Sequence, residues 1–250
     1  GVFQLESSGM RATLMQLCPA SLEEIMAAIA LFRPGPVKSI PKYVANKKDH
    51  GNISYRLPQI KGILASTYGC IVYQEQVMQI FRAVAGYSYG RADIVRKAMS
   101  KKKADVMAKE REYFVHGKLN DDGSVDVPGC VKNGIPEDAA NTIFDEMTSF
   151  AAYAFNKSHA AAYALVGYYT AYLKYYYPTE FMAAMLNSFR FNLAAAACYI
   201  SCCASMDIAV LPPDINRSKA KFSTEKFSNG KNAIRIGMSM IKNVGEGAVE

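Results

Sequence analysis

The sequence lacks two motifs that mark large classes of self-sufficient enzymes. It contains no GxxxxGK[ST] loop to cradle a phosphate and no H-E-x-x-H motif to bind zinc. Two-metal phosphoryl transfer needs carboxylates that project together from a strand, and no strand-like segment carries such a pair. We therefore expect no catalytic residue in this chain.

Cysteine is scarce, and its spacing excludes the common metal motifs. The chain has six cysteines and no CxxC pair, which is too few for a disulfide scaffold. Cys202 and Cys203 are adjacent, so on a helix they point in different directions, and no histidine lies near them to complete a zinc site with Cys198. Around Gly123 the sequence resembles a calcium loop, but the glycine comes too early and no glutamate closes it. We expect reduced thiols and no metal ligands.

Signals for secretion and for a membrane span are also missing. The chain opens on Gly1 without the basic and apolar regions of a signal peptide, and a start without methionine indicates an excised fragment. The most apolar stretch, 159–177, contains seven tyrosines and Lys174, so we expect a buried helix there and not a membrane span. These features predict a cytoplasmic protein without a membrane partner.

Positive charge is concentrated in one part of the chain. The net charge is +7, from 29 basic and 22 acidic residues, and residues 82–118 contribute +6 with ten basic and four acidic side chains. Such a segment is suited to bind a polyanion, because each neutralised phosphate releases condensed counterions. A solvated helix face is the alternative, and it explains most charge runs.

Helix signals recur throughout the sequence. Ser21 can cap a helix that stops before Pro34, and a second helix runs from Tyr73 to a left-handed cap at Gly86. Ser88 begins a third helix. At 100° per residue, this helix turns Ile94, Val95, Ala98 and Met99 inward and Asp93, Arg96, Lys97 and Ser100 outward.

Further helices and two small hairpins complete the predicted fold. Pro136 starts a helix, Ser158 caps the tyrosine-rich helix that Pro178 ends, and Thr179 caps a shorter helix after it. Turn residues near Gly123 and Gly230 separate alternating segments, as in β-hairpins. The sequence therefore predicts a mainly α fold with small β-hairpins.

Three segments have residues suited to hold phosphates. The string FNKSH, 155–159, brings polar groups to a helix start where free amides attract anions, although Asn and Ser there are also ordinary caps. Tyr163 lies one turn further on and can stack on a base or pack in a core. The run VRKAMSKKK, 95–103, offers an arginine fork with mobile lysines behind it. The terminal VGEGAV has glycines that let backbone amides approach a phosphate, or it is a simple glycine turn.

Several long strings, taken in order, resemble the bacterial DNA polymerase III alpha subunit, a C-family replicative polymerase. They are GVFQLESSGM, ALFRPGP, YGCIVYQEQVMQI, GRADIVRKAMSKKK, FNKSHAAAYALVGYYTAYLKYYYPTEFMAAML and VLPPDIN, and together they cover almost the whole chain. The resemblance implies that residues 1–188 form the helical fingers domain. Residues 189–250 would connect into a truncated helix-hairpin-helix and clamp-binding region.

The same resemblance implies a role in chromosomal DNA replication. The intact protein is a DNA-directed DNA polymerase, a nucleotidyltransferase whose fingers bind the incoming dNTP and template-primer DNA. The catalytic aspartates and the Mg²⁺ ions they bind lie in the palm, upstream of Gly1, so the fragment alone is expected to be inactive and to hold no cofactor. The sliding clamp and other replisome subunits are the expected protein partners, in the bacterial cytoplasm.

The family motifs carry over onto particular residues. The family's basic pair, usually Arg-Arg, matches Arg96 and Lys97, and the lysine keeps the charge but loses the fork for a bidentate contact. FNKSH matches without change. The implied nucleotide-binding residues are Arg96, Lys97, Asn156, Lys157, Ser158, His159 and Tyr163. The expected DNA-binding residues are Arg33, Lys101, Lys102, Lys103, Gly245 and Gly247.

Two other functions remain open from the residues alone. A non-catalytic helical nucleic-acid-binding module would use the same basic face without a nucleotide pocket, and its binding would depend steeply on salt. A protein-interaction scaffold would instead offer the positive patch to an acidic partner.

Overall fold

The structure, a computed structural model, describes residues 1–101, 104–151, 153–227 and 230–249. Its contacts divide the chain into a larger unit, residues 4–166, and a smaller unit, residues 1–3 with 167–250. Helices dominate both units, and short strands form two small sheets. The predicted mainly α fold with small β-hairpins is confirmed.

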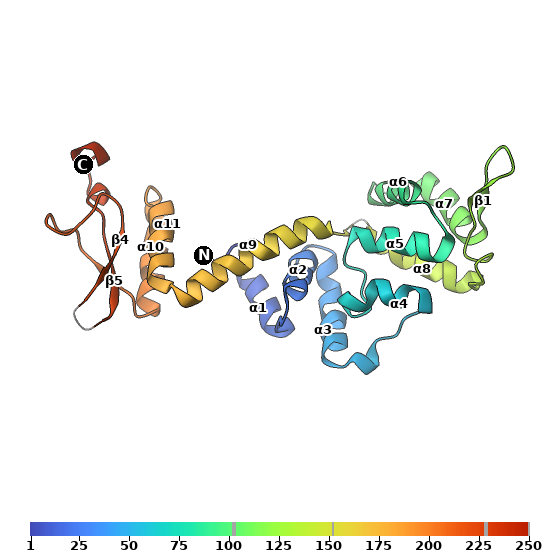
Figure 1. The fold of residues 1–250 in the computed structure, drawn as a ribbon, viewed down its shortest axis with the longest axis horizontal. Coiled ribbons are helices and arrows are strands. Elements are labelled where there is room, and N and C mark those ends of the chain that lie inside the picture. Colours follow the sequence, from blue (N-terminus) through green and yellow to red (C-terminus); the bar gives the residue numbers. More distant parts are fainter. Residues whose placement is uncertain (102–103, 152, 228–229, 250) are drawn as a thin grey trace. The chain divides into compact units, whose positions relative to one another are not determined.

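The larger unit contains eight helices, the first half of a ninth and one hairpin among its described residues (Figure 1). The helices are α1 Ser8–Leu17, α2 Leu22–Leu31, α3 Ile40–Lys48, α4 Pro58–Leu64, α5 Gln74–Ala85, α6 Tyr89–Ser100, α7 Ala104–His116, α8 Glu137–Ala151 and α9 Lys157–Tyr176. Strands β1 Lys118–Leu119 and β2 Val125–Val127 pair antiparallel, and short 3-10 helices span Pro36–Ser39, His50–Asn52 and Ala65–Thr67.

Capping residues set several helix ends where the sequence predicts them. The Ser21 hydroxyl oxygen accepts from the Glu24 amide at 3.3 Å, and that of Ser88 accepts from the Arg91 amide at 3.2 Å. Gly86 ends α5 with φ of +77°, a left-handed conformation that glycine adopts without strain. These caps fix where α2, α5 and α6 begin or end.

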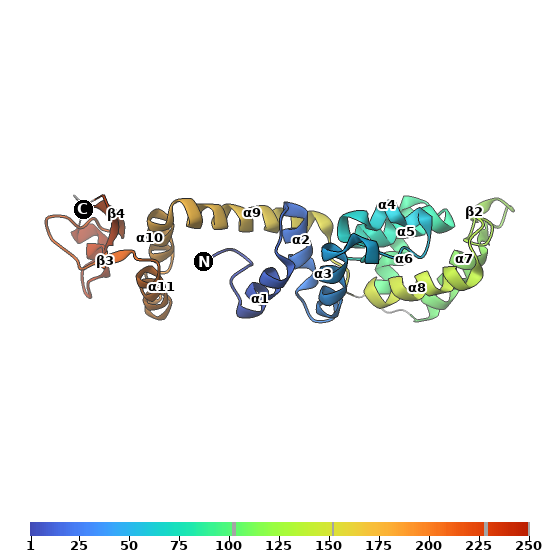
Figure 2. The same ribbon diagram turned by 90° about the horizontal axis from the view of Figure 1, so that it is seen from below.

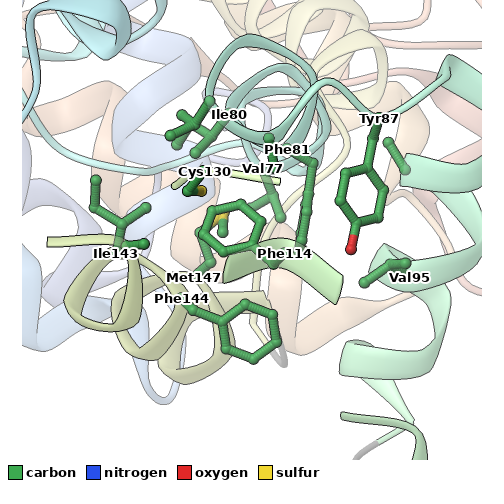
Figure 3. Packing of buried hydrophobic residues seen from close by; sticks show 14 of the residues in the cluster. Val77, Ile80, Phe81, Tyr87, Val95, Phe114, Cys130, Ile143, Phe144 and Met147 are labelled. Atoms are coloured by element: carbon green, nitrogen blue, oxygen red, sulfur yellow. The ribbon is translucent and has the colours of Figure 1, made fainter. Parts of the chain in front are cut away.

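An aromatic core joins α5, α7 and α8. The Phe81 ring lies 5.1 Å from Phe114 and 6.1 Å from Phe144 between centroids, at interplanar angles of 80° and 90° (Figure 3). The inner stripe of α5 is wholly buried; it consists of Val77, Ile80, Phe81 and Val84, at the i, i+3, i+4, i+7 spacing of one helix face. Figure 2 shows α8 alongside α6 and α7, with which it packs.

A second core gathers α1, α2, α3 and the first turns of α9, where Ala160 and Ala164 are fully buried. At its edge the buried Glu24 carboxylate accepts from Lys47 Nζ at 2.8 Å and from the Tyr68 hydroxyl at 2.5 Å. Burial raises the pKa of Glu24, but these bonds outweigh burial and bring it below its usual value. The carboxylate is thus charged and ties α2 to α3.

The smaller unit joins the rest of α9 to two helices and a three-stranded sheet. These are α10 Pro178–Ser188, α11 Leu193–Ser205, β3 Ala209–Leu211, β4 Ser223–Lys226 and β5 Asn232–Arg235. The strand order is β3-β5-β4, with β4 antiparallel and β3 parallel to β5. The β4–β5 hairpin was predicted and β3 was not. Two 3-10 helices, Met238–Met240 and Glu246–Ala248, follow β5.

Two predictions about side-chain orientation are wrong. Ile94 is 66% exposed and the Arg96 side chain only 15%, the reverse of the expected arrangement. Val95, Ala98 and Met99 are buried and Lys97 is exposed, as predicted, and Ala92 completes the inner face. The stretch 159–177 is helical but is not buried as a whole. Its buried side chains are alanines, and most of its tyrosines point outward.

Two predicted caps are also wrong. α9 begins at Lys157, one residue before Ser158, and the Asn156 side chain accepts from the His159 amide at 2.8 Å. α10 begins at Pro178, so Thr179 lies inside it. Pro178 does separate the two helices, as predicted. None of the described helices has the length and apolar character needed to cross a membrane.

The aromatic core gives a direct test of packing. We expect Phe81→Ala to lower the free energy of unfolding by about 3–5 kcal/mol, because it leaves a cavity beside the Phe114 and Phe144 rings. Ile94→Ala, on the neighbouring α6, should change it by less than about 0.5 kcal/mol because that side chain is exposed. Chemical denaturation followed by circular dichroism measures both, and equal losses would contradict this core.

The Glu24 cluster predicts a pH dependence. Because the folded pKa of Glu24 is lowered, the unfolded state binds more protons between the two pKa values. Its contribution is therefore complete above the unfolded pKa of about 4.3 and is lost as pH falls through the folded value. We expect Glu24→Gln to destabilise the chain at pH 7 and the difference from wild type to shrink below pH 4. Glu23→Gln, at the exposed neighbouring position, is the matched control for the loss of one carboxylate.

Candidate functional site

The starts of α5 and α9 lie side by side although they are far apart in sequence. Tyr73 and Phe155 form a parallel bridge, in which the Gln74 amide donates to the Phe155 carbonyl at 2.9 Å. The Phe155 amide donates in turn to the Val72 carbonyl at 3.3 Å. Figure 1 shows the two helix starts meeting. Polar side chains from both first turns therefore share one neighbourhood.

Glu75 occupies the amino end of α9. Its two carboxylate oxygens accept from the Lys157 amide at 3.1 and 3.0 Å, and one of them accepts from Asn156 Nδ2 at 3.1 Å. With the His159 amide bonded to Asn156, the amides of Lys157 and His159 both have acceptors. The expectation of free amides here is wrong for these two groups, because a carboxylate from α5 already meets the positive end of the helix dipole.

Although two amides of the FNKSH segment have acceptors, most of its side chains face solvent. The side chains of Asn156, Lys157, Ser158 and His159 are exposed, and Tyr163 is half-buried. The His159 ring lies 4.0 Å from the Tyr163 ring and 5.3 Å from the Phe155 ring between centroids. These three rings form an aromatic column along the first two turns of α9, with His159 in the middle.

Arg33 extends this column. Its guanidinium lies 4.2 Å from the centre of the Phe155 ring, and its Nη2 donates to the Tyr153 carbonyl at 2.8 Å. Burial lowers the pKa of this guanidinium, which nevertheless stays charged at neutral pH. The sequence predicts that Arg33 binds DNA; in the structure it supports the segment that leads into α9.

Arg96 reaches the same neighbourhood through Gln74. Arg96 Nη1 donates to Gln74 Oε1 at 2.9 Å, and Gln74 Nε2 donates to the Ala154 carbonyl at 3.0 Å. The other end of the guanidinium donates to Asp93 Oδ1 from Nε at 3.0 Å and from Nη2 at 2.7 Å. The structure therefore brings Arg96 and residues 154–157 together.

Lys97 shares Asp93 with Arg96. Lys97 Nζ lies 2.6 Å from Asp93 Oδ2, and its side chain is 62% exposed. Hydrogen bonds from Lys97 and Arg96 hold the pKa of the Asp93 carboxyl below its usual value. Two cations around one carboxylate leave a net positive charge. An exposed pair of this kind is weak, so a phosphate can compete for Lys97.

The remaining cations of 82–118 do not form one uniform basic face. Arg91 pairs with Glu110 at 3.0 Å and with Asp126 at 2.9 Å, and its side chain is 17% exposed. Arg111 pairs with Asp145 of α8. The net charge of this segment is therefore partly balanced by carboxylates on β2 and α8, a pairing that a count along the sequence does not reveal.

Of the other predicted DNA-binding residues, three follow α6 in the sequence and two belong to the smaller unit. Lys101 is exposed at the end of α6, and Lys102 and Lys103 are outside the described residues. Gly245 and Gly247 belong to the smaller unit, where a Cβ on either would meet no heavy atom within 4 Å. The fold itself therefore does not require glycine at these two positions.

A hydrolase-like pattern near α6 has a structural explanation. Residues 86–90 read G-x-S-x-G, the spacing of a nucleophile elbow, which normally joins a strand to a helix. Here Ser88 lies between two helices, and its hydroxyl caps α6. This serine is a helix cap.

A cavity of about 800 Å³ opens between α3 and α8 in the larger unit. Its lining includes Lys38, Lys42, Arg56, Asp145 and Glu146. Arg56 and Glu146 pair at 2.6 Å, so the cavity wall carries charges of both signs. Among the described residues, no three His, Cys, Asp or Glu side chains come close enough to hold a metal ion.

Sequence reasoning missed Gln74 and Glu75, which connect the predicted residues. Both stand in the first turn of α5 within the string YQEQ, directly after the buried Tyr73. The sequence shows two polar side chains at a helix start, which is the one local signal for them. It does not show that α9 lies beside them, because that contact depends on the tertiary structure.

The chain matches two protein families. Residues 1–122 match the bacterial DNA polymerase III alpha subunit finger domain, and residues 207–250 match the helix-hairpin-helix motif. The second match includes β3, β4 and β5 as well as the predicted glycine segment.

Relatives from several bacteria cover nearly all of the chain. DNA polymerase III subunit alpha of Thermus aquaticus is 46% identical over 251 residues, covering 98% of this chain and 19% of the relative. The subunit from Bacillus subtilis (strain 168) is 41% identical, with 100% and 21% covered, and that from Pseudomonas aeruginosa is 43% identical, with 100% and 20% covered. The chain thus spans about a fifth of the length of these relatives. Because the similarity runs through its whole length and includes the finger-domain match, the chain belongs to the bacterial DNA polymerase III alpha subunit family, as a fingers-region segment.

Proposed function

We propose that this chain is the fingers portion of a DNA-directed DNA polymerase and binds the incoming dNTP and template-primer DNA during replication. The observation that carries the proposal is the junction of α5, α6 and α9, where Arg96 and the Asn156–His159 segment are tied to neighbouring residues. The finger-domain match gives the junction its context.

Cations at this junction suit a triphosphate. Arg96 offers a planar fork, while Lys97 and Lys157 offer point charges on flexible stems. Asp93 holds Arg96 and Lys97 in place by ion pairs. These pairs fix the two cations before a ligand arrives, so the cations are preorganised. An arriving phosphate group then competes with the Asp93 carboxylate for them.

The aromatic column suits a base. His159 is exposed and its ring lies at 38° to the Tyr163 ring, so the pair offers aromatic faces on which any base can stack. Ser158 and Asn156 beside it offer hydrogen-bonding groups. In this proposal the column helps to shape the pocket for the nascent base pair.

Mg²⁺ and the catalytic aspartates are proposed to come from the palm of the intact polymerase. The carboxylates at the junction do not fit a metal site, because Glu75 accepts from amides and Asp93 from cations. We therefore assign them no part in metal binding, and we propose that the fragment alone is inactive. In the intact enzyme the metal would neutralise phosphate charge.

DNA contacts are proposed for Arg33, Lys101 and the glycines of the helix-hairpin-helix segment. Lys102 and Lys103 continue the basic run in sequence. Sliding clamp and other replisome contacts belong to the intact protein in the bacterial cytoplasm. These assignments depend on the family and on exposed positive charge.

Arg96 provides the main test. In the intact polymerase we expect Arg96→Ala to lower kcat/KM for dNTP about 10- to 100-fold, since a charge-assisted hydrogen bond is worth about 1.5–3 kcal/mol. Lys97→Ala should lose less, because its pair with Asp93 is exposed. Lys61→Ala, an exposed lysine on α4, is the matched control for charge. Steady-state primer extension measures all three, and an Arg96→Ala enzyme with normal kinetics removes the proposed role.

Gly247 provides a separate test of DNA binding. A Cβ at this position has room within the protein, so a side chain there disturbs only a ligand that approaches the backbone closely. We expect Gly247→Val in the intact polymerase to weaken primer-template binding about tenfold, or about 1.4 kcal/mol, without lowering Tm. Gly62→Ala, on α4, is the control. Equal affinity of Gly247→Val and wild type in fluorescence anisotropy would rule out close approach at this glycine.

A further inference from the structure

We propose that Gln74 and Glu75 are positioning residues that couple the Arg96 guanidinium to the first turn of α9. The inference rests on the proposed function, in which Arg96 and α9 contact the nucleotide. Neither residue needs to touch substrate. Their role is to fix the position of α9 relative to Arg96.

Gln74 makes the connection by using both ends of its amide. Its oxygen accepts from Arg96 Nη1 at 2.9 Å, and its nitrogen donates to the Ala154 carbonyl at 3.0 Å. A primary amide supplies a donor and an acceptor, both bonded to one carbon, without charge. Replacing either end of the amide breaks the link while leaving the other contact possible.

Glu75 completes the connection on the side of α9. Its carboxylate accepts twice from the Lys157 amide and once from Asn156 Nδ2. Asn156 in turn accepts from the His159 amide at 2.8 Å. Glu75 thus sets the direction of the first turn and with it the places of the Lys157 and His159 side chains.

The next residue, Gln76, shows what a purely structural glutamine does here. It is buried, its oxygen accepts from the Val72 and Tyr73 amides, and its nitrogen donates to Thr67 Oγ1 at 2.8 Å. None of these contacts involves α6 or α9. Gln76 therefore stabilises the entry to α5, whereas Gln74 and Glu75 face the two groups of the proposed nucleotide site.

Gln74 links a movement of Arg96 to the backbone that leads into α9. If Arg96 moves toward a phosphate, Gln74 must follow it or release it, and the backbone at Ala154 leads directly into α9. Hydrogen-bonded chains of this kind carry energetic coupling between groups that do not touch. A phosphate at Arg96 is thereby linked to the position of the His159 and Tyr163 rings.

The test uses Gln74→Ala and Gln74→Glu in the intact polymerase. Glutamate keeps an acceptor for Arg96 but loses the donor to Ala154, so coupling predicts that it fails to rescue activity. We expect both variants to lower kcat/KM for dNTP about three- to tenfold, with Tm equal to that of the exposed α5 control Gln79→Ala. Wild-type kinetics in Gln74→Glu would overturn the coupling, as would a loss explained by lowered Tm.

A double-mutant cycle separates this inference from the proposed function. Coupling predicts that Gln74→Ala with Arg96→Ala loses no more than Arg96→Ala alone, within about twofold. Additive losses would overturn the coupling and leave the Arg96 role intact. If Arg96→Ala itself has normal kinetics, the proposed function falls first.

The Glu75 part is tested with its conservative variant. We expect Glu75→Ala to lower kcat/KM about three- to tenfold at unchanged Tm, and Glu75→Gln to recover part of the loss because its amide oxygen still accepts from the Lys157 amide. Normal kinetics in Glu75→Ala would show that Glu75 has no positioning role.

Discussion

The pairing of the backbone at 72–74 with Phe155 is the contact on which the candidate site depends. Two hydrogen bonds hold the starts of α5 and α9 together and bring Glu75 to the amides of α9. Without this bridge, Arg96 and the FNKSH segment would be separate basic features of one helical unit. With it, side chains from α5, α6 and α9 share one neighbourhood.

Charge at this junction is balanced within the protein. Asp93 faces Arg96 and Lys97, and Glu75 faces the positive end of α9. Such pairing lowers the energetic cost of gathering cations and fixes their geometry before a ligand arrives. The pairs around Asp93 are partly exposed, so they can exchange for a phosphate more readily than buried pairs.

Both errors of orientation arise where alanines lie on the buried face of a helix. Ala92 shares the inner face of α6 with Val95 and Met99 while Ile94 is exposed, and Ala160 and Ala164 let α9 pack closely while most of its tyrosines point out. A prediction of the buried face from hydrophobicity along the sequence gives large apolar side chains more weight than alanines. In a folded helix, the neighbour that packs against it decides which face is buried.

The sequence alone determined the helical class, the caps at Ser21, Ser88 and Gly86, the hairpins and the family, because these depend on local backbone preferences and on long matching strings. Tertiary structure alone decided that Gln74 and Glu75 link Arg96 to α9, and that Arg91 and Arg111 meet carboxylates instead of solvent. These contacts join residues distant along the chain. Local periodicity cannot specify them, because it describes one element at a time and a contact between elements depends on how both are packed.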